Sequence, residues 1–238
     1  MSVATRPLAV ARQGVPAGVV AIPVRTPLVR CGDDLVAIVV AAVAGIAREG
    51  DVIAVSETAL AIAQGEFVAA EHVRPSALAY LLARRAGPMA TVSQPESMQI
   101  VIDRAGTSKV LYATLAHLIG RAFGRRGAFY KVLGGTLAAI DGYTGTLPPF
   151  ERAIVFAPRD CAAFAQAVYE RTGAGCAVVD ANDLQKAKTL GVSEGVNAPL
   201  VEQSLLDNPH GNADEQTPLV VLKWRGHGVS PMFEGPSS

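Results

Sequence analysis

The residues best suited to hold a ligand form one short loop, Gly120-Arg121-Ala122-Phe123-Gly124-Arg125-Arg126-Gly127. Three arginines and three glycines fall within these eight residues, in a chain of which only 18% is charged. Glycine lets the backbone turn its N–H groups toward a ligand, and arginine offers a planar fork of donors that matches phosphate or carboxylate. We therefore predict an anion site here, although a basic surface turn would also explain the pattern. The predicted site residues are Gly120, Arg121, Gly124, Arg125, Arg126 and Gly127.

Acidic residues that could hold a hard cation follow the apolar run Cys176–Val179, in the order Asp180-Ala181-Asn182-Asp183. Magnesium prefers carboxylate, phosphate and water oxygens, and an arginine loop with separate carboxylates describes a nucleoside-triphosphate site. Asp180 and Asp183 are therefore predicted metal ligands, although either could instead cap the next helix. Glu57, Asp141 and Glu215 are further acidic candidates.

A second group of polar residues follows the β-branched run Asp51–Val55, in the order Ser56-Glu57-Thr58, before a small-residue stretch that ends at Gly65. A strand that leads into polar residues and then into an Ala-rich helix places them at the carboxyl end of the strand. Ligands usually bind at that end in open α/β sheets. Ser56 and Glu57 are thus candidate ligand contacts, and the alternative is that Ser56 or Thr58 caps the helix.

The histidines and cysteines indicate no further chemistry. Four scattered histidines define no Ser/His/Asp order, and His117, within an apolar run, is typical of a core residue. Cys31, Cys161 and Cys176 are far apart and show no Cys-x-x-Cys spacing, which argues against a disulfide framework or a zinc site.

The overall composition excludes several classes of partner. The chain has 21 basic and 21 acidic residues, so no global field draws it to nucleic acid or to an anionic membrane, and local patches must do any charge recognition. The most apolar window, 35–47, is shorter than the roughly 20 residues that a bilayer span needs. The N-terminus lacks the features of a secretory signal. We expect a cytoplasmic protein that binds neither nucleic acid nor a membrane.

The periodicity predicts an alternation of strands and helices. The predicted helices cover 35–48, about 58–65, 76–85 and 158–171, and 109–119 is predicted as a helix or a buried segment. The predicted strands cover 15–24, 51–55, 98–103, 129–133, 136–140, 153–156, 176–179 and 219–223.

Several phrases together resemble the coenzyme F-420 gamma-glutamyl ligase family over roughly residues 26–224. They include Gly32-Asp33-Asp34-Leu35, Gly50-Asp51-Val52-Ile53, Gln64-Gly65, Gly120-Arg121-x-Phe123 with Arg125, and Asp180-x-Asn182-Asp183-Leu184. The resemblance is strongest to a divergent, ligase-like branch with Phe-Gly-Arg-Arg-Gly, Asp-Asn-Pro-x-Gly and Glu-Gln-Thr-Pro. These phrases stand at 123–127, 207–211 and 215–218.

The resemblance implies an α+β fold with mixed sheets and flanking helices, and a homodimer with the site near the subunit interface. One ligase-like domain would cover 1–238, with a loose tail at 227–238, and could divide into lobes at about 1–147 and 148–226. Family members join glutamate to a deazaflavin phospholactate, a small phosphate-bearing substrate, with GTP and a divalent cation, magnesium or manganese. The acid would be activated as an acyl phosphate. Ser56, Glu57 and Gln64 would then line the acceptor side.

The chain departs from the family at the stretch that contacts the nucleotide. The family's Lys-x-x-Ser-Lys-x-Glu-Gly aligns with Thr58–Gly65, which lacks both lysines, the serine and the glutamate. His117 stands where an acidic residue is expected. A second hypothesis is therefore a non-catalytic phosphate- or nucleotide-binding protein that kept the fold and lost ligase activity.

Overall fold

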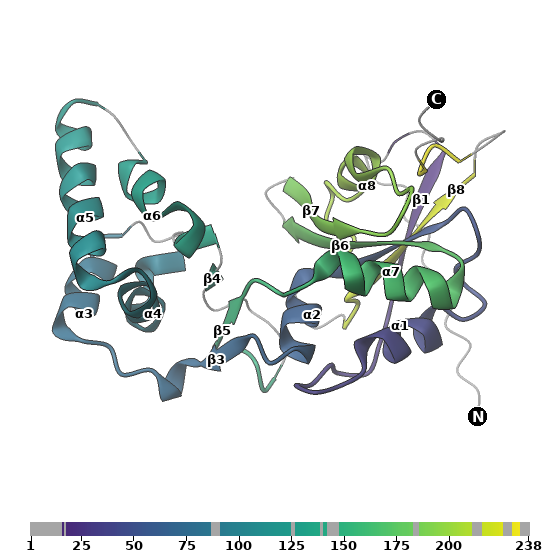
Figure 1. Ribbon diagram of the computed structural model, residues 1–238, viewed down its shortest axis with the longest axis horizontal. Coiled ribbons are helices and arrows are strands. Elements are labelled where there is room, and N and C mark those ends of the chain that lie inside the picture. The colour runs from purple at the N-terminus through teal and green to yellow at the C-terminus, as the bar shows by residue number, and fades with distance from the viewer. Residues whose placement is uncertain are drawn as a thin grey trace. The chain divides into compact units, whose positions relative to one another are not determined.

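The protein folds into two compact units, each with its own sheet (Figure 1). The computed structural model describes residues 16, 18–86, 91–124, 127–138, 140–141, 148–182, 186–210, 216–225 and 230–233. Met1–Gly65 and Pro158–Ser238 form the first unit, here called the sheet unit, and Glu66–Ala157 form the second, the helical unit. The two lobes predicted from the sequence, about 1–147 and 148–226, do not share the boundaries of these units. The division into those lobes stays a prediction.

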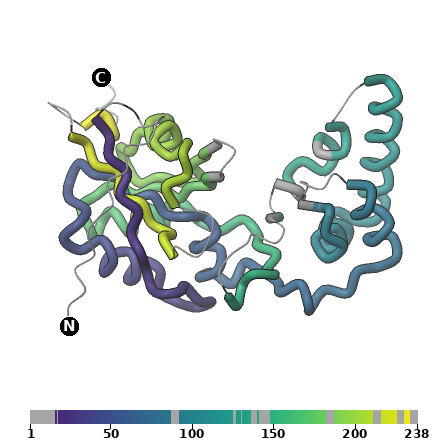
Figure 2. The backbone as a smooth tube through the Cα atoms, turned by 180° about the vertical axis from the view of Figure 1, so that it is seen from behind, coloured from purple at the N-terminus to yellow at the C-terminus, as the bar shows by residue number. Residues whose placement is uncertain are grey.

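The sheet unit is built on a five-stranded mixed sheet in the order β1-β8-β2-β6-β7. β2 runs parallel to β6, and the other neighbouring pairs are antiparallel. Figure 2 shows β1 and β8, which come from opposite ends of the chain, side by side. This mixed sheet with helices confirms the predicted α+β fold. The strands are β1 (Val19–Val24), β2 (Val52–Ser56), β6 (Gly175–Asn182), β7 (Lys186–Val192) and β8 (Leu219–Trp224).

Helices cover both faces of this sheet. α1 (Leu35–Val43) begins at Asp34, whose carboxylate accepts a hydrogen bond of 2.9 Å from the N–H of Ala37. α1 and α7 (Cys161–Thr172) pack together on one face, while α8 (Ala198–Ser204) packs on the other, against a core that includes Val52, Ala177 and Val220. α2 (Glu57–Ala63) follows β2 directly. Because both faces are covered, the central strands read as continuous apolar runs rather than alternating ones.

One half-buried ion pair fastens the start of β2 to β8. The ammonium of Lys223 lies 2.7 Å from the carboxylate of Asp51, which also accepts a hydrogen bond of 2.9 Å from the N–H of Arg48. The backbone carbonyl of Asp51 accepts from the N–H of Gly175, at the start of β6. Asp51 therefore ties three neighbouring strands together at one end of the sheet.

The helical unit has a separate core and a small antiparallel sheet in the order β3-β5-β4. Met98, Val101, Val110, Leu133 and Ile154 are fully buried in this core. Its strands are β3 (Phe67–Ala69), β4 (Ile140–Asp141) and β5 (Ala153–Phe156). Its helices are α3 (Ala77–Ala83), α4 (Pro95–Ala105), α5 (Thr107–Ala122) and α6 (Ala128–Ala138), with short 3-10 turns at Ala70–His72 and Thr91–Ser93. None of the described helices in either unit is long and apolar enough to cross a membrane.

Three predicted strands of this unit are wrong. Residues 98–103 lie in α4, which begins with Pro95 at a favoured first position and Glu96 in the first turn. Six alternating residues were too few to separate a strand from a buried helix, because the helix buries Ile100, Val101 and Ile102 in succession. Residues 129–133 lie in α6, and 136–140 run from α6 into β4. Strands β3 and β7 and helix α8 were not predicted.

Gly191 allows β7 to pass close to the start of α7, and this contact gives a test of the packing. A Cβ at Gly191 would lie 2.4 Å from the backbone nitrogen of Ala162 and 2.5 Å from the carbonyl carbon of Cys161. We expect Gly191→Ala to lower the free energy of unfolding by about 1–3 kcal/mol, because backbone atoms must move to admit the methyl group. Urea denaturation of the purified protein measures this change.

Gly135→Ala is the matched control, because a Cβ at Gly135 would meet nothing within 4 Å and its φ is not positive. It should leave the free energy of unfolding unchanged or slightly raised. Equal losses in the two variants would show that Gly191 is not the site of a close contact.

Candidate functional site

Polar residues of the sheet unit gather at the edge where the parallel strands β2 and β6 end. Ser56, the last residue of β2, stands in register with Val179 of β6, and its N–H donates a hydrogen bond of 2.8 Å to the carbonyl of Pro218. β8 begins at Leu219, the residue after Pro218. Because β8 runs antiparallel to β2, its first residues lie beside the last residues of β2. We call this the carboxyl edge, meaning Ser56, Glu57, Asp180 and the segment Gln216–Pro218. Its position agrees with the rule for ligand sites in α/β sheets.

Ser56 and Glu57 occupy the turn from β2 into α2. Ser56 holds the N-cap position of α2, yet its hydroxyl makes no capping hydrogen bond. The Ser56 side chain therefore does not cap the helix. Glu57 opens the first turn of α2, where the helix dipole favours a negative charge. Burial raises the pKa of the Cys161 thiol, and the carboxylates of Glu57 and Asp160 raise it further. Cys161 is therefore protonated at neutral pH and is no nucleophile.

Gln64 binds protein backbone in this structure. Its side-chain amide donates a hydrogen bond of 2.8 Å to the carbonyl of Arg159, and its oxygen accepts one of 2.7 Å from the N–H of the same residue. The side chain thus holds the end of α2 against the segment that leads into α7. This pairing gives Gln64 a positioning role, and its predicted contact with substrate stays a prediction.

Asp180 lies in β6, one residue beyond the pair formed by Ser56 and Val179. Because side chains alternate along a strand, Asp180 lies on the opposite face of the sheet from Val179 and Ser56. Burial raises the pKa of its carboxyl group, and Lys188, directly opposite on β7, partly offsets this effect. A half-buried carboxylate that lacks full solvation would gain from a neighbouring cation.

The predicted second ligand, Asp183, lies outside the described residues, as do Glu215 and the side chain of Asp141. In the part of the chain that the structure describes, no group of three or more His, Cys, Asp or Glu side chains could hold a metal ion. The donor type of Asp180 fits a hard cation such as magnesium, but the metal site itself stays a prediction.

A buried histidine at this edge was missed by the sequence analysis. The Nδ1 of His210 lies 3.2 Å from the carbonyl of Thr217, and the hydroxyl of Thr217 donates a hydrogen bond to the carbonyl of His210. The Nε2 of His210 is buried and has no partner among the described residues. The N–H of Thr26, just after β1, donates to the carbonyl of Gln216. The phrases at 207–211 and 215–218 are therefore joined to each other and, through Pro218, to Ser56.

The arginine loop belongs to the helical unit, where it continues the C-terminal end of α5. Gly120 and the exposed Arg121 lie in the last turn of α5, and Gly124 and Gly127 have positive φ values of 73° and 85° that favour glycine. The N–H groups of Phe123 and Gly124 donate to carbonyls of the last helical turn. They are thus not available to cradle an anion, and the predicted site depends on its arginine side chains. Arg125 and Arg126 lie outside the described residues.

The structure therefore divides the predicted site residues between the two units. Ser56, Glu57, Gln64 and Asp180 belong to the sheet unit, whereas Gly120, Arg121, Gly124 and Gly127 belong to the helical unit. His117, also in α5, buries its Nδ1 without a partner among the described residues. The phosphate, substrate and metal roles of these residues stay predictions.

A comparison with known families reaches both units. A protein-family model described as F420-0:gamma-glutamyl ligase matches residues 23–179. The matched range runs from the end of β1 to Val179 in β6, so it contains Ser56, Glu57, Gln64 and the arginine loop. No curated protein matches the chain.

The two hydrogen bonds of Gln64 lead to a stability prediction. Gln64→Ala should lower the free energy of unfolding by about 1–2 kcal/mol, because both backbone groups of Arg159 lose their partner. Gln64→Glu should cost at least as much, since a carboxylate oxygen would face the carbonyl of Arg159. Urea denaturation measures both, with Gln203→Ala, at an exposed position on α8, as a control expected within about 0.5 kcal/mol of the parent.

The buried His210 leads to a pH prediction. Burial lowers the pKa of His210 from 6.5 to about 4, with a small opposing effect from the carbonyl of Thr217. As the pH drops below 6.5, His210 binds a proton in the unfolded chain but stays neutral in the folded chain. The free energy of unfolding should therefore fall as the pH drops from 7 toward 4. In His210→Gln this part of the loss, on the order of 3 kcal/mol, should disappear. Parallel pH profiles of the parent and the variant would contradict the assignment.

Proposed function

Because the chain belongs to the F420-0:gamma-glutamyl ligase family, we propose that it is a metal- and nucleotide-dependent ligase that forms an amide bond on a phosphate-bearing substrate. The observation that carries this proposal is the carboxyl edge of the sheet unit. There Ser56 and Glu57 follow the end of β2, Asp180 comes one residue after the β6 partner of Ser56, and one hydrogen bond joins Ser56 to the segment before β8. An edge lined with carboxylates and hydroxyls suits a charged substrate and a hard cation.

The proposed reaction has two steps. A carboxylate oxygen of the acceptor attacks the γ-phosphorus of GTP or ATP, which forms an acyl phosphate and releases the nucleoside diphosphate. The amine of glutamate then attacks the carbonyl carbon, phosphate leaves, and the amine loses a proton. Such displacements depend mainly on positioning and on neutralising charge around the phosphoryl group.

The predicted charged and polar side chains have the following parts in this scheme. Asp180, together with Asp183, would hold magnesium or manganese, which would neutralise phosphate charge when bound. Arg121, Arg125 and Arg126 would hold phosphate oxygens through charge-assisted hydrogen bonds. Ser56 and Glu57 would line the acceptor side. Gln64 would act through the backbone of Arg159, which it already binds.

One observation favours the alternative, a phosphate- or nucleotide-binding protein without ligase activity. The stretch that carries two lysines in the family forms α2 here, and Ala59–Ala63 are buried. Glu57 is the one charged residue within the bounds of α2. A lysine lost from a phosphate site removes a contact worth roughly 1.5–3 kcal/mol, so turnover would depend on other cations.

Thermal melting separates the two functions. The protein is melted with GTP, ATP or a flavin phosphate, each with and without magnesium or manganese. At a ligand concentration about a hundred times the dissociation constant, binding should stabilise the fold by about 2.7 kcal/mol and raise the melting temperature. A ligase should show the shift only with metal, whereas a simple anion site should show it without metal.

Variants assign the shift to the predicted residues. Asp180→Asn should abolish the metal requirement or the shift, and Arg121→Ala should weaken the nucleotide effect. Arg84→Ala, an exposed arginine after α3, is the matched control and should melt like the parent. The absence of any nucleotide shift under all conditions would contradict the ligase function, and the absence of a shift with every phosphate ligand would contradict the alternative as well.

A further inference from the structure

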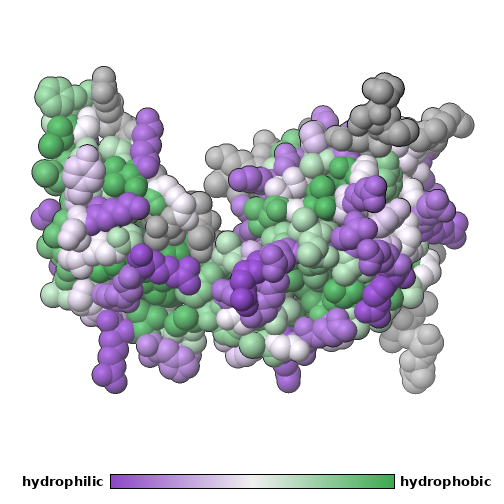
Figure 3. Space-filling view, viewed as in Figure 1, coloured by the Kyte–Doolittle hydropathy of each residue, from purple (hydrophilic) through white to green (hydrophobic). Residues whose placement is uncertain are grey.

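The exposed side of α5 is apolar along most of the helix. Phe123 is 79% exposed and Tyr112 is 64% exposed, although both are large aromatic residues. Figure 3 shows hydrophobic residues along the part of the helical unit where α5 lies. The exposed apolar side chains on or next to α5, here called the α5 face, are Leu111, Tyr112, Leu115, Leu118, Ile119 and Phe123. Exposed apolar patches of this kind mark interaction sites.

The helix places cations on both sides of this face. At about 100° per residue, the exposed apolar residues within α5 fall in an arc of about 120° centred on Leu115. Lys109 and Arg121, both exposed, lie about 120° from Leu115, one to each side. Val110 and Ala113 are buried on the opposite side of the helix. An apolar face with aromatic residues and flanking cations is typical of a helix that lies in the plane of a membrane surface.

The sequence around α5 carries basic charge that no acidic residue offsets. Between Asp103 and Asp141 there is no aspartate and no glutamate, although the whole chain has 21 acidic and 21 basic residues. The basic residues of this stretch are Arg104, Lys109, Arg121, Arg125, Arg126 and Lys131. The zero net charge of the chain therefore conceals one strongly basic stretch, and an anionic partner would be attracted to it.

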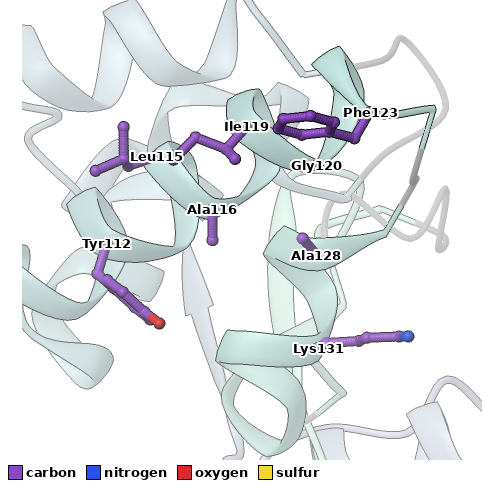
Figure 4. A pocket seen from close by; sticks show the side chains of 8 residues that line it. All are labelled: Tyr112, Leu115, Ala116, Ile119, Gly120, Phe123, Ala128 and Lys131. Atoms are coloured by element: carbon purple, nitrogen blue, oxygen red, sulfur yellow. The ribbon is translucent and has the colours of Figure 1, made fainter.

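A groove beside the α5 face adds room for an apolar chain. It lies between α5 and α6, has a volume of about 820 Å³, and is lined mostly by apolar residues (Figure 4). Ala116 on α5 and Ala128 on α6 line it with small side chains. Among the described residues that line it, Lys131 alone is charged. An apolar groove with one ammonium group matches the chemistry of a lipid, which joins acyl chains to an anionic headgroup.

Charge decides between the surfaces that could cover this face. A second copy of the chain would bring the same cations, Lys109, Arg121 and Lys131, to the contact, and like charges disfavour such a pairing. A neutral apolar partner would leave these cations without counter-charges. The negative surface of a bilayer compensates them and also receives the apolar side chains.

We propose that the α5 face docks on the headgroup layer of an anionic bilayer, with α5 lying in the plane of the surface. The apolar side chains of the face enter the acyl boundary, and Lys109, Arg121 and Lys131 contact lipid phosphates. We expected no membrane contact from the net charge of the whole chain, but recognition depends on this local patch. The docking does not depend on the ligase function proposed above.

Co-sedimentation with sucrose-loaded vesicles tests the proposal. The full chain should bind vesicles of phosphatidylcholine that contain about a third phosphatidylglycerol. Binding to phosphatidylcholine alone should be at least tenfold weaker, because the cations lose their counter-charges. About 0.5 M salt should weaken binding to the anionic vesicles to a similar extent, since it screens the same contacts.

Two double variants separate the apolar part of the contact from the basic part. Leu115→Ser with Leu118→Ser keeps the charge and should weaken binding about tenfold, because less apolar area enters the bilayer. Lys109→Gln with Lys131→Gln keeps the apolar side chains and should weaken binding to the anionic vesicles about tenfold or more. Thermal melts that match the parent's show that these variants fold.

Matched controls lie in the sheet unit. Arg25→Gln with Arg48→Gln removes the same charge from exposed positions and should bind like the parent. Leu190→Ser, at a 37% exposed leucine, should also bind like the parent. Equal losses in the lysine variant and in its arginine control would show that overall charge, rather than the α5 face, controls the binding, and would overturn the proposal.

A fluorescent label tests which surface enters the bilayer. In a Cys31→Ser background, a polarity-sensitive dye on Leu118→Cys should shift its emission to shorter wavelengths with anionic vesicles, whereas the dye on Leu190→Cys should not. A parent that does not bind anionic vesicles would overturn the proposal. A dimer in gel filtration that Leu115→Ser with Leu118→Ser splits into monomers would also overturn it, because a second copy would then cover the face.

Discussion

Hydrogen bonding of β2 between β6 and β8 is the constraint on which the sheet unit depends. Val52, Ile53, Ala54 and Val55 are fully buried, and each backbone edge of the strand is paired to a segment more than a hundred residues away. A strand with both faces covered must be apolar throughout, and its backbone groups must all find partners. The first 65 residues therefore cannot complete their fold without residues 158–238.

The same pairing creates the carboxyl edge. Because β2 and β6 are parallel, their ends meet, and the antiparallel β8 brings the segment before Leu219 to the same place. Ser56, Asp180 and Thr217 come from three distant parts of the sequence, and the sheet alone brings them to one edge. The rigid strands fix these positions, while hydrogen bonds from Gln64 and His210 hold the loops around them.

The core of the helical unit does not depend on this strand pairing. Its core is complete without the sheet unit, since α4 is buried among α3, α5 and α6. The surplus of apolar side chains on α5 is not needed for that core, and it lies on the exposed side of the helix. Exposed apolar surface of this kind, on a unit with a core of its own, is typical of interaction sites.

Local patterns were enough to determine part of this protein. β-branched runs predicted β2, β5, β6 and β8, and apolar spacing with caps predicted α1, α3, α5 and α7, because both signals depend on near neighbours in the chain. The family resemblance, carried by short phrases, is confirmed by the match over residues 23–179. Tertiary structure decided the rest. The run 98–103 became a helix because the burial of Met98 and of Ile100–Ile102 outweighs a short alternation, and the burial that keeps His210 neutral is a property of the folded chain. The sequence patterns predicted one site for the arginine loop and Asp180. Long-range strand pairing, however, determines which side chains belong to the same unit. That pairing assigns them to different units, and no local pattern records it.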